Sequence, residues 1–316
     1  MQHYYLGLDG GQSSTTALIA DEQGRVVGSA EAGPCNHVTG PDAQAKFATV
    51  IGDCLAQASR DIAHASTIPV FAAACLGFSG GPEDKAALAR KLIRSARLKI
   101  THDAEIALTG ATAGEPGIVI IAGTGSIAFG RNAAGRTARA GGWGYVFGDE
   151  GGGFDLVRRA LRAALQFEEG WGPATSLHSV LLKKAGAGSA IDLLHRFYSA
   201  PARKTIAAFA PLVSECAEAG DPVAQAVLAE SADRLSWYVE GIYHNLFTPP
   251  ERVTIAYIGG VFRSAQLLRA FAEHVRTRIG CEPVSPRFSP AAGAVLEALR
   301  LDGNPSQLTG VPEIKT

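Results

Sequence analysis

Apolar and polar residues repeat the same order of short segments at two places in the chain. Each block holds three short apolar runs separated by polar turns, a pattern that predicts β-strands. These strands cover 4–9, 14–20 and 25–31 in the first block and 117–122, 126–131 and about 136–140 in the second. A polar turn separates the second strand from the third in each block, at Asp21–Gly24 and at Asn132–Gly135. The repeated order predicts two related α/β units.

Helical periodicity occupies most of the remaining chain. Helices are predicted at 42–64, 83–96, 104–113, 263–279 and 291–301, and further helices dominate 153–246, with breaks near Gly170–Pro173, Ala185–Gly188 and Gly220–Pro222. A buried strand is predicted at Val70–Gly77, a short strand at Leu98–Thr101 and a further strand at Arg252–Ile258. The tail from Asp302 to Thr316 is polar and contains two prolines, so we expect it to be loosely held.

Composition narrows the class of protein. A chain of 316 residues is long enough for two domains that each bury a core. Its 29 basic and 30 acidic residues nearly balance, so charge gives no argument for binding to nucleic acid or to an anionic membrane. No apolar run approaches the roughly 20 residues that span a bilayer, and the first strand begins too early to leave room for a signal peptide. Five scattered cysteines without a CxxC or Cys/His cluster favour a reduced, cytoplasmic protein without structural zinc or disulfides.

Two Gly-rich turns lie between paired strands, at Asp9–Thr16 and at Ala122–Ser126. Glycine lets the backbone approach a phosphate closely and present its N–H groups. In the first turn an acid at the end of a strand can hold hydrated Mg²⁺, and the hydroxyls can donate to phosphate oxygens. The alternative is a tight hairpin whose Asp bonds only its own turn. The repetition favours two turns that grip one polyphosphate.

A third Gly-rich segment, Ile258–Ser264, follows a strand and precedes a helix. Such a segment can pack flat against an adenine ring and place a helix N-terminus near a phosphate. A strand-to-helix turn that only needs small residues is the alternative.

Asp103 follows a short strand and precedes a helix. A carboxylate there can accept the proton of a substrate hydroxyl during phosphoryl transfer. Asp is also a favoured helix N-cap, so the residue alone leaves both roles open.

The segment Gly141–Gly153 is rich in glycine and closes on two acids. Trp143 offers an apolar face, and Asp149 and Glu150 can accept hydrogen bonds, a combination suited to sugars. A core Trp and an N-cap acid are the alternative. Asn36 follows a strand and can bond a polar substrate, or it is a turn residue.

These segments together resemble the N-acetylglucosamine kinases of the BadF/BadG/BcrA/BcrD ATPase family, within the actin, hexokinase and heat-shock-chaperone ATPase superfamily. The resemblance runs from about Gly7 to about Leu299. Its most specific motif is GGWGYVFGDEG, and DGGQSSTT, CNH, THDA, AGTGS and IGGVFRSAQLL stand in the same order.

The resemblance implies an α/β protein of two ribonuclease-H-like domains of the actin/hexokinase type, with ATP and sugar in a central cleft. One domain would cover 1–114, joined by the C-terminal segment at about 288–316, and the other would cover 115–287 with a helical insertion. Asp103 would be the catalytic base that activates the sugar 6-hydroxyl, and Asp9 would hold Mg²⁺ through water.

The resemblance also assigns the binding residues. ATP phosphates would contact Asp9, Gly10, Gly11, Gln12, Ser13, Ser14, Thr15, Gly123, Thr124 and Gly125, and the adenosine would contact Gly259, Gly260 and Ser264. The sugar would contact Asn36, Asp103, Thr124, Gly125, Ser126, Gly142, Trp143, Asp149 and Glu150. Relatives have a third Gly and a basic residue in the first turn, where this chain has Gln12 and Ser14. Neutralisation of the phosphate charge would therefore depend more on Mg²⁺ and on backbone N–H groups.

The predicted reaction is phosphorylation of N-acetylglucosamine at its 6-hydroxyl by ATP. Close variants of the family act on glucosamine or N-acetylmuramic acid, and these acceptors remain open. A non-kinase ATPase that activates acyl-CoA dehydratases is disfavoured, because no cysteine pair has the spacing of iron–sulfur ligands. An ATP-binding module without catalysis is weaker still, because Asp9, Asp103 and both turns are present. A homodimer is plausible for the family.

Overall fold

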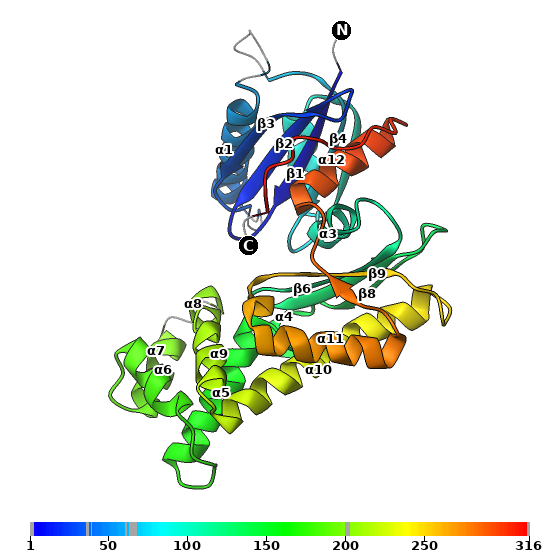
Figure 1. The fold of residues 1–316 in the computed structure, drawn as a ribbon. Coiled ribbons are helices and arrows are strands. Elements are labelled where there is room, and N and C mark those ends of the chain that lie inside the picture. The colour runs from blue at the N-terminus through cyan, green and yellow to red at the C-terminus, as the bar shows by residue number, and fades with distance from the viewer. Residues whose placement is uncertain are drawn as a thin grey trace. The chain divides into compact units, whose positions relative to one another are not determined.

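A computed structural model describes residues 3–35, 38, 40–60, 62, 68–199 and 203–314. The chain divides into two compact units (Figure 1). Unit 1 joins the residues up to Gly117 with the segment that starts at Ser285, and unit 2 covers Ile118–Val284.

Unit 1 is built on a mixed five-stranded sheet in the order β3-β2-β1-β4-β5. The strands are β1 (Tyr4–Gly10), β2 (Thr15–Asp21), β3 (Val26–Ala32), β4 (Phe71–Phe78) and β5 (Ser95–His102). The first three strands pair antiparallel, while β1, β4 and β5 run parallel. The parallel strands therefore end at the same edge of the sheet.

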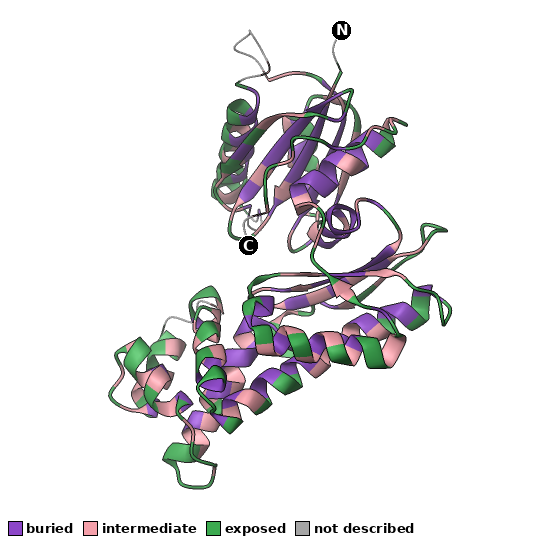
Figure 2. Cartoon of the chain, in the orientation of Figure 1, coloured by how far each residue is buried: buried purple, intermediate pink, exposed green. Residues whose placement is uncertain are grey.

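Helices cover both faces of this sheet. One face packs against α1 (Pro41–Ala58) and α2 (Ala86–Leu92), and the other against α3 (Asp103–Ala111) and α12 (Pro290–Leu301). The buried stripes of β1, β4 and α12 are visible in Figure 2. Helix α12 lies directly on β1, since a Cβ at Gly7 would stand 2.3 Å from the backbone nitrogen of Val295.

Unit 2 repeats the arrangement with a sheet in the order β10-β9-β6-β7-β8. Its strands are β6 (Gly117–Ala122), β7 (Ser126–Arg131), β8 (Thr137–Gly141), β9 (Thr254–Ile258) and β10 (Pro283–Val284). Its helices are α4 (Gly144–Phe147), α5 (Gly153–Glu168), α6 (Leu177–Ala185), α7 (Ala190–Ser199), α8 (Arg203–Ala207), α9 (Ala210–Glu218), α10 (Pro222–Leu246), the short 3₁₀-helix η1 (Gly260–Arg263) and α11 (Ala265–Ile279). Within the described ranges, no helix combines the length and the apolarity needed to cross a bilayer.

The predicted α/β class with two ribonuclease-H-like units is confirmed. The two sheets have the same strand order. In each unit the first three strands of the chain lie side by side in succession, and the fourth and fifth strands continue the sheet on the other side of the first. The hydrophobic repeat that predicted related units therefore reflects a repeated sheet.

Three local predictions were wrong. The helix predicted at 83–96 ends at Leu92, because Ser95 already pairs with Phe71 of β4 and the ladder outweighs the local helical pattern. The helix predicted at 42–64 ends at Ala58. The tail is not loose where it is described: Thr309 exchanges backbone hydrogen bonds with the β2–β3 hairpin, and Leu308 is buried.

Candidate functional site

The carboxyl edge of the parallel strands in unit 1 brings two acids together. Gly10 of β1 pairs with Phe78 of β4, which pairs with His102 of β5. Gly10, Phe78 and His102 thus form one row across the sheet. Asp9 directly precedes Gly10 in the chain, and Asp103 directly follows His102. Ligands of open α/β sheets bind at this edge because the strand ends leave loops and helix N-termini there.

The charge of Asp103 acts on the Asp9 carboxylate. Burial, and after it the negative charge of Asp103, raises the pKa of Asp9 from 3.8 to about 7. Asp103 is the first residue of α3, and its Oδ1 accepts a hydrogen bond from the Ala104 N–H at 2.8 Å. His102 occupies the N-cap position, so the alternative in which Asp103 caps the helix does not hold.

This pair fits a divalent cation. A carboxylate whose charge is penalised by its surroundings gains most from a bound metal ion. Within the described ranges the Asp9 carboxylate accepts no hydrogen bond, and its side chain is partly exposed. Mg²⁺ is commonly held by one or two carboxylates together with water and substrate phosphates. Asp9, with Asp103 beside it, provides such a donor set.

The first Gly-rich turn connects β1 to β2. The Gly11 N–H donates to the Ser14 carbonyl at 3.0 Å, which closes the turn. Gln12 and Ser13 are exposed and Ser14 is half-buried, so they can reach a ligand. Thr15 is fully buried instead, and its hydroxyl donates to the Gly33 carbonyl at 2.8 Å. Its side chain therefore fixes the next loop and is not presented at the surface of the turn.

Asn36, predicted to contact the sugar, lies outside the described residues. The nearest described residues, Cys35 and Val38, are each held by a hydrogen bond. The Cys35 N–H donates to the Gly11 carbonyl, and the Val38 N–H donates to Asp84 Oδ2 at 3.0 Å. The Asp84 charge is balanced by the fully buried Lys85 at 2.8 Å.

The second Gly-rich turn, between β6 and β7, is joined to the start of α5. The N–H groups of Gly153 and Phe154 donate to the carbonyls of Gly123 and Thr124, at 2.8 and 3.0 Å. Residue 125 must be small, because a Cβ there would stand 2.4 Å from Asp149 Oδ2. The turn and the following acidic loop thus form one packed element.

The acids of that loop already have partners in unit 2. Asp149 is buried and forms an ion pair with Arg203 of α8 at 2.6 Å. The Glu150 carboxylate accepts from the Tyr238 hydroxyl, and its carbonyl accepts from the Ser126 hydroxyl at 2.6 Å. Burial and the Glu150 hydrogen bond raise the pKa of Tyr238, so the phenol stays protonated.

Trp143 is not a core residue. Its side chain is 65% exposed, and its ring carries the Arg139 guanidinium 4.6 Å from its centre. The preceding Gly142 has φ of 71° and donates its N–H to the Ser126 carbonyl at 3.0 Å. The structure therefore presents an aromatic ring beside the second turn, and aromatic side chains are common in the lining of small-molecule sites.

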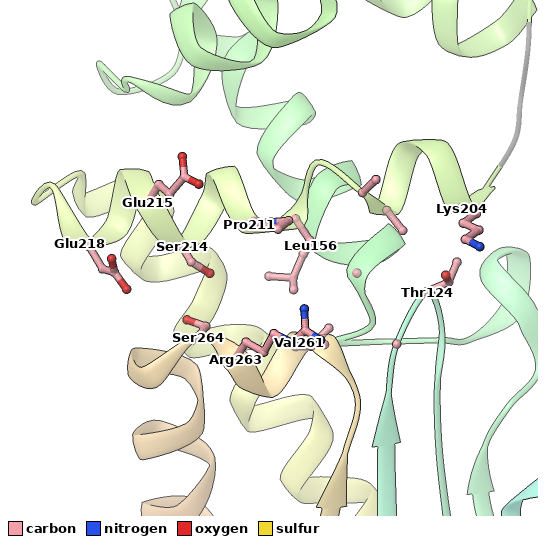
Figure 3. Close-up of a pocket in the computed structure, with 16 residues that line it drawn as sticks. Thr124, Leu156, Lys204, Pro211, Ser214, Glu215, Glu218, Val261, Arg263 and Ser264 are labelled. Carbon is pink, nitrogen blue, oxygen red and sulfur yellow. The ribbon is translucent and has the colours of Figure 1, made fainter. Parts of the chain in front are cut away.

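The third Gly-rich segment borders a cavity of about 700 Å³ within unit 2 (Figure 3). Gly259 has φ of 115°, and a Cβ there would stand 2.3 Å from the Ala122 carbonyl oxygen, so only glycine lets β9 and β6 end side by side. Gly260 and Ser264 line the cavity together with Gly123 and Thr124 of the second turn. Ser264 also caps α11, accepting from the Leu267 N–H at 3.4 Å.

Helices α8 and α9 supply cavity residues that the sequence did not reveal. The far wall is lined by Lys204, Pro211, Ser214, Glu215 and Glu218. They belong to a helical region without Gly-rich or charged motifs, so only the cavity identifies them. Arg203 was missed for the same reason. The volume matches that of a small-molecule site, and the cavity joins two of the three Gly-rich segments.

Curated relatives and a solved structure are similar to this chain over most of its length. A Clostridium acetobutylicum protein named N-acetylmuramic acid/N-acetylglucosamine kinase is 32% identical over 274 residues, which cover 84% of this chain and 87% of the relative. A Dictyostelium discoideum protein named N-acetyl-D-glucosamine kinase is 30% identical over 311 residues, which cover 93% of this chain and 97% of the relative. The crystal structure of a candidate N-acetylglucosamine kinase from Chromobacterium violaceum matches with a TM-score of 0.75 at 27% identity, covering 93% of this chain and 98% of that one.

A family model also matches most of the chain. Residues 6–298 match the model of the BadF/BadG/BcrA/BcrD ATPase family, which includes all three Gly-rich segments and Asp103. The family predicted from the sequence motifs is thereby confirmed: the chain belongs to the BadF/BadG/BcrA/BcrD ATPase family.

Proposed function

We propose that this protein is an amino-sugar kinase that transfers the γ-phosphoryl group of ATP to the 6-hydroxyl of N-acetylglucosamine. Membership of an ATPase family supports ATP as the donor, and the names of the relatives support an amino sugar as the acceptor. The single observation that carries the mechanism is the position of Asp103 beside Asp9 at the carboxyl edge of the unit 1 sheet.

Asp103 acts as the general base. Its carboxylate accepts the proton of the 6-hydroxyl while the sugar oxygen forms a bond to the γ-phosphorus and the bond to the β–γ bridging oxygen breaks. ADP leaves with the electron pair of that bond. The second carboxylate, Asp9, would hold Mg²⁺ through water, and the ion would supply positive charge to the phosphates.

The nucleotide and the sugar use different parts of the predicted residues. We assign the adenosine to Gly259, Gly260 and Ser264, of which Gly260 and Ser264 line the unit 2 cavity, and the phosphates to the two Gly-rich turns. The sugar contacts Asn36 and the second-turn residues Thr124, Gly125 and Ser126, with Gly142 and Trp143 beside them. Asp149 keeps Oδ1 outside its ion pair with Arg203, and we assign that oxygen to a sugar hydroxyl. Glu150 orders the same loop through Tyr238.

The test is ADP release with Mg·ATP and a panel of acceptors: N-acetylglucosamine, N-acetylmuramic acid, glucosamine and glucose. We expect N-acetylglucosamine to give the highest kcat/KM. N-Acetylmuramic acid is the second candidate, because the name of the Clostridium relative includes it. Absence of acceptor-dependent ADP release from the whole panel would refute the proposal.

A non-kinase ATPase activator is not favoured by the structure. An iron–sulfur cluster shared by two copies needs accessible thiolates, whereas all five cysteines are free and buried. Burial also raises the pKa of Cys54 to about 11, which keeps that thiol protonated.

A further inference from the structure

The first phosphate turn has no basic residue. Its segment Asp9–Thr16 offers backbone N–H groups and hydroxyls, but its one charged side chain is the acid Asp9. Phosphoryl-transfer sites neutralise the charge of the transferred group with Lys, Arg and metal ions. A cation placed elsewhere along the phosphates is therefore expected.

Helix α8 places such a cation on the nucleotide cavity. Lys204, Ala207 and Ala208 all line the cavity, and their spacing puts them on one face of a helical turn. The Ala208 N–H donates to the Lys204 carbonyl at 3.0 Å, so the helical geometry holds across all three. Figure 3 shows the Lys204 ammonium directed toward Thr124 of the second turn.

The neighbouring cation is already used for a different purpose. Arg203 pairs with the buried Asp149 at 2.6 Å and lies over the Tyr145 ring at 5.0 Å. Both contacts fix α8 against the acidic loop. Lys204 is exposed, and its ammonium forms no ion pair or hydrogen bond with any residue that the structure describes. One cation therefore anchors the helix, and the next remains available for a ligand.

The charged residues that line the cavity favour one orientation of a bound nucleotide. Glu215 and Glu218 line the end away from Lys204, and the apolar side chains of Leu156 and Val261 lie between the two ends (Figure 3). A second cation, Arg263, also lines the cavity, in the same segment as Ser264, which is assigned to the adenosine. Phosphates are repelled by the acidic end and attracted to the end where Lys204 meets Thr124. A nucleotide thus fits with its phosphates at the second turn.

We propose that Lys204 is a phosphate-binding cation of this site, pairing with the phosphate chain of ATP beside Thr124 and supplying positive charge that the first turn lacks. The proposal rests on the proposed function only in taking a nucleoside polyphosphate as the ligand.

Calorimetry with ADP and with adenosine, both in Mg²⁺, tests the proposal. Lys204→Met should weaken ADP binding about 10- to 100-fold, as expected for loss of a charge-assisted hydrogen bond. Adenosine has no phosphate, so its affinity should stay within about twofold of the wild-type value. Lys204→Arg should restore most of the ADP affinity. Lys184→Met, at an exposed lysine of α6, is the matched control and should change neither affinity.

Two outcomes would overturn the assignment. Unchanged ADP affinity in Lys204→Met would show that the ammonium does not reach the phosphates. Equal losses for ADP and adenosine would show a structural role for the side chain. The proposed function is tested by a different measurement. It is refuted if the wild-type protein phosphorylates none of the acceptors, whatever its affinity for ADP.

Discussion

The raised pKa of Asp9 predicts that its carboxylate destabilises unit 1 when no ligand is bound. The surroundings of Asp9 and the charge of Asp103 raise its pKa from 3.8 to about 7. Asp9→Asn removes the ionisable group while it preserves the size of the side chain. We therefore expect the substitution to stabilise unit 1 at neutral and alkaline pH.

The sign and size follow from proton linkage. Between pH 4 and pH 7 the folded protein keeps a proton on Asp9 that the unfolded chain releases, so the contribution of Asp9 to stability falls as pH rises. Above pH 7 both states are ionised and the full penalty applies. About three pKa units correspond to about 4 kcal/mol, an upper bound because the side chain is partly exposed. At pH 4 the expected difference between variant and wild type is below about 1 kcal/mol.

Hydrogen exchange of the β1 and β4 peptides measures this difference, since comparison of variant and wild type at the same pH cancels the intrinsic exchange rate. Protection in Asp9→Asn should exceed that of the wild type at pH 8 and match it at pH 4. Asp53→Asn, at an exposed position of α1, is the control and should have no effect. A gain that is equal at both pH values would refute the reasoning. The stabilised variant should also bind Mg·ATP more weakly, the usual conflict between stability and function at a charged site.

Three further predictions test the site. Asp103→Asn should lower kcat at least about 100-fold while sugar affinity, measured by calorimetry, changes little; full turnover would exclude it as the base. Arg203→Met leaves the buried Asp149 charge unpaired and should lower the free energy of unfolding by about 1–3 kcal/mol in thermal denaturation. Adding Asp149→Asn should recover part of that loss, and additive losses would contradict the pairing. Gly125→Ala would bring a Cβ within 2.4 Å of Asp149 and should cost about 1–3 kcal/mol. Gly123→Ala meets nothing within 4 Å and should be close to neutral in stability, so equal effects of the two would disprove the steric account.

The hairpin strands and Gly-rich turns were predictable because their signals are local. Alternating apolar residues identify β1 and β2, and glycine is required at Gly259, where the backbone of β9 meets that of β6. The first residues of β5 were assigned to a helix because their strand conformation depends on pairing with β4, which lies more than twenty residues earlier in the chain.

The candidate site was predictable only in part. Asp103 was identified as an acid at the end of a strand, but its distance from Asp9 depends on the parallel order of β1, β4 and β5. The ion pair of Asp149 with Arg203 joins residues far apart in the chain, and no local pattern records it. Lys204 lies in a helical region where the spacing of apolar residues indicates which side chains are buried but does not indicate which side chains bind a ligand.

Helix α12 governs the order in which the protein can fold during synthesis. The ribosome makes the strands of unit 1 first, yet one face of their sheet, including Tyr5 and Cys75, is covered by Val295 and its neighbours. That face stays open until α12 emerges, whereas the segment that forms unit 2 ends earlier, at Val284. We therefore expect unit 2 to fold before unit 1. A premature stop codon just before α12 would consequently remove the support of β1, and with it that of Asp9, although α12 and β1 are far apart in the sequence.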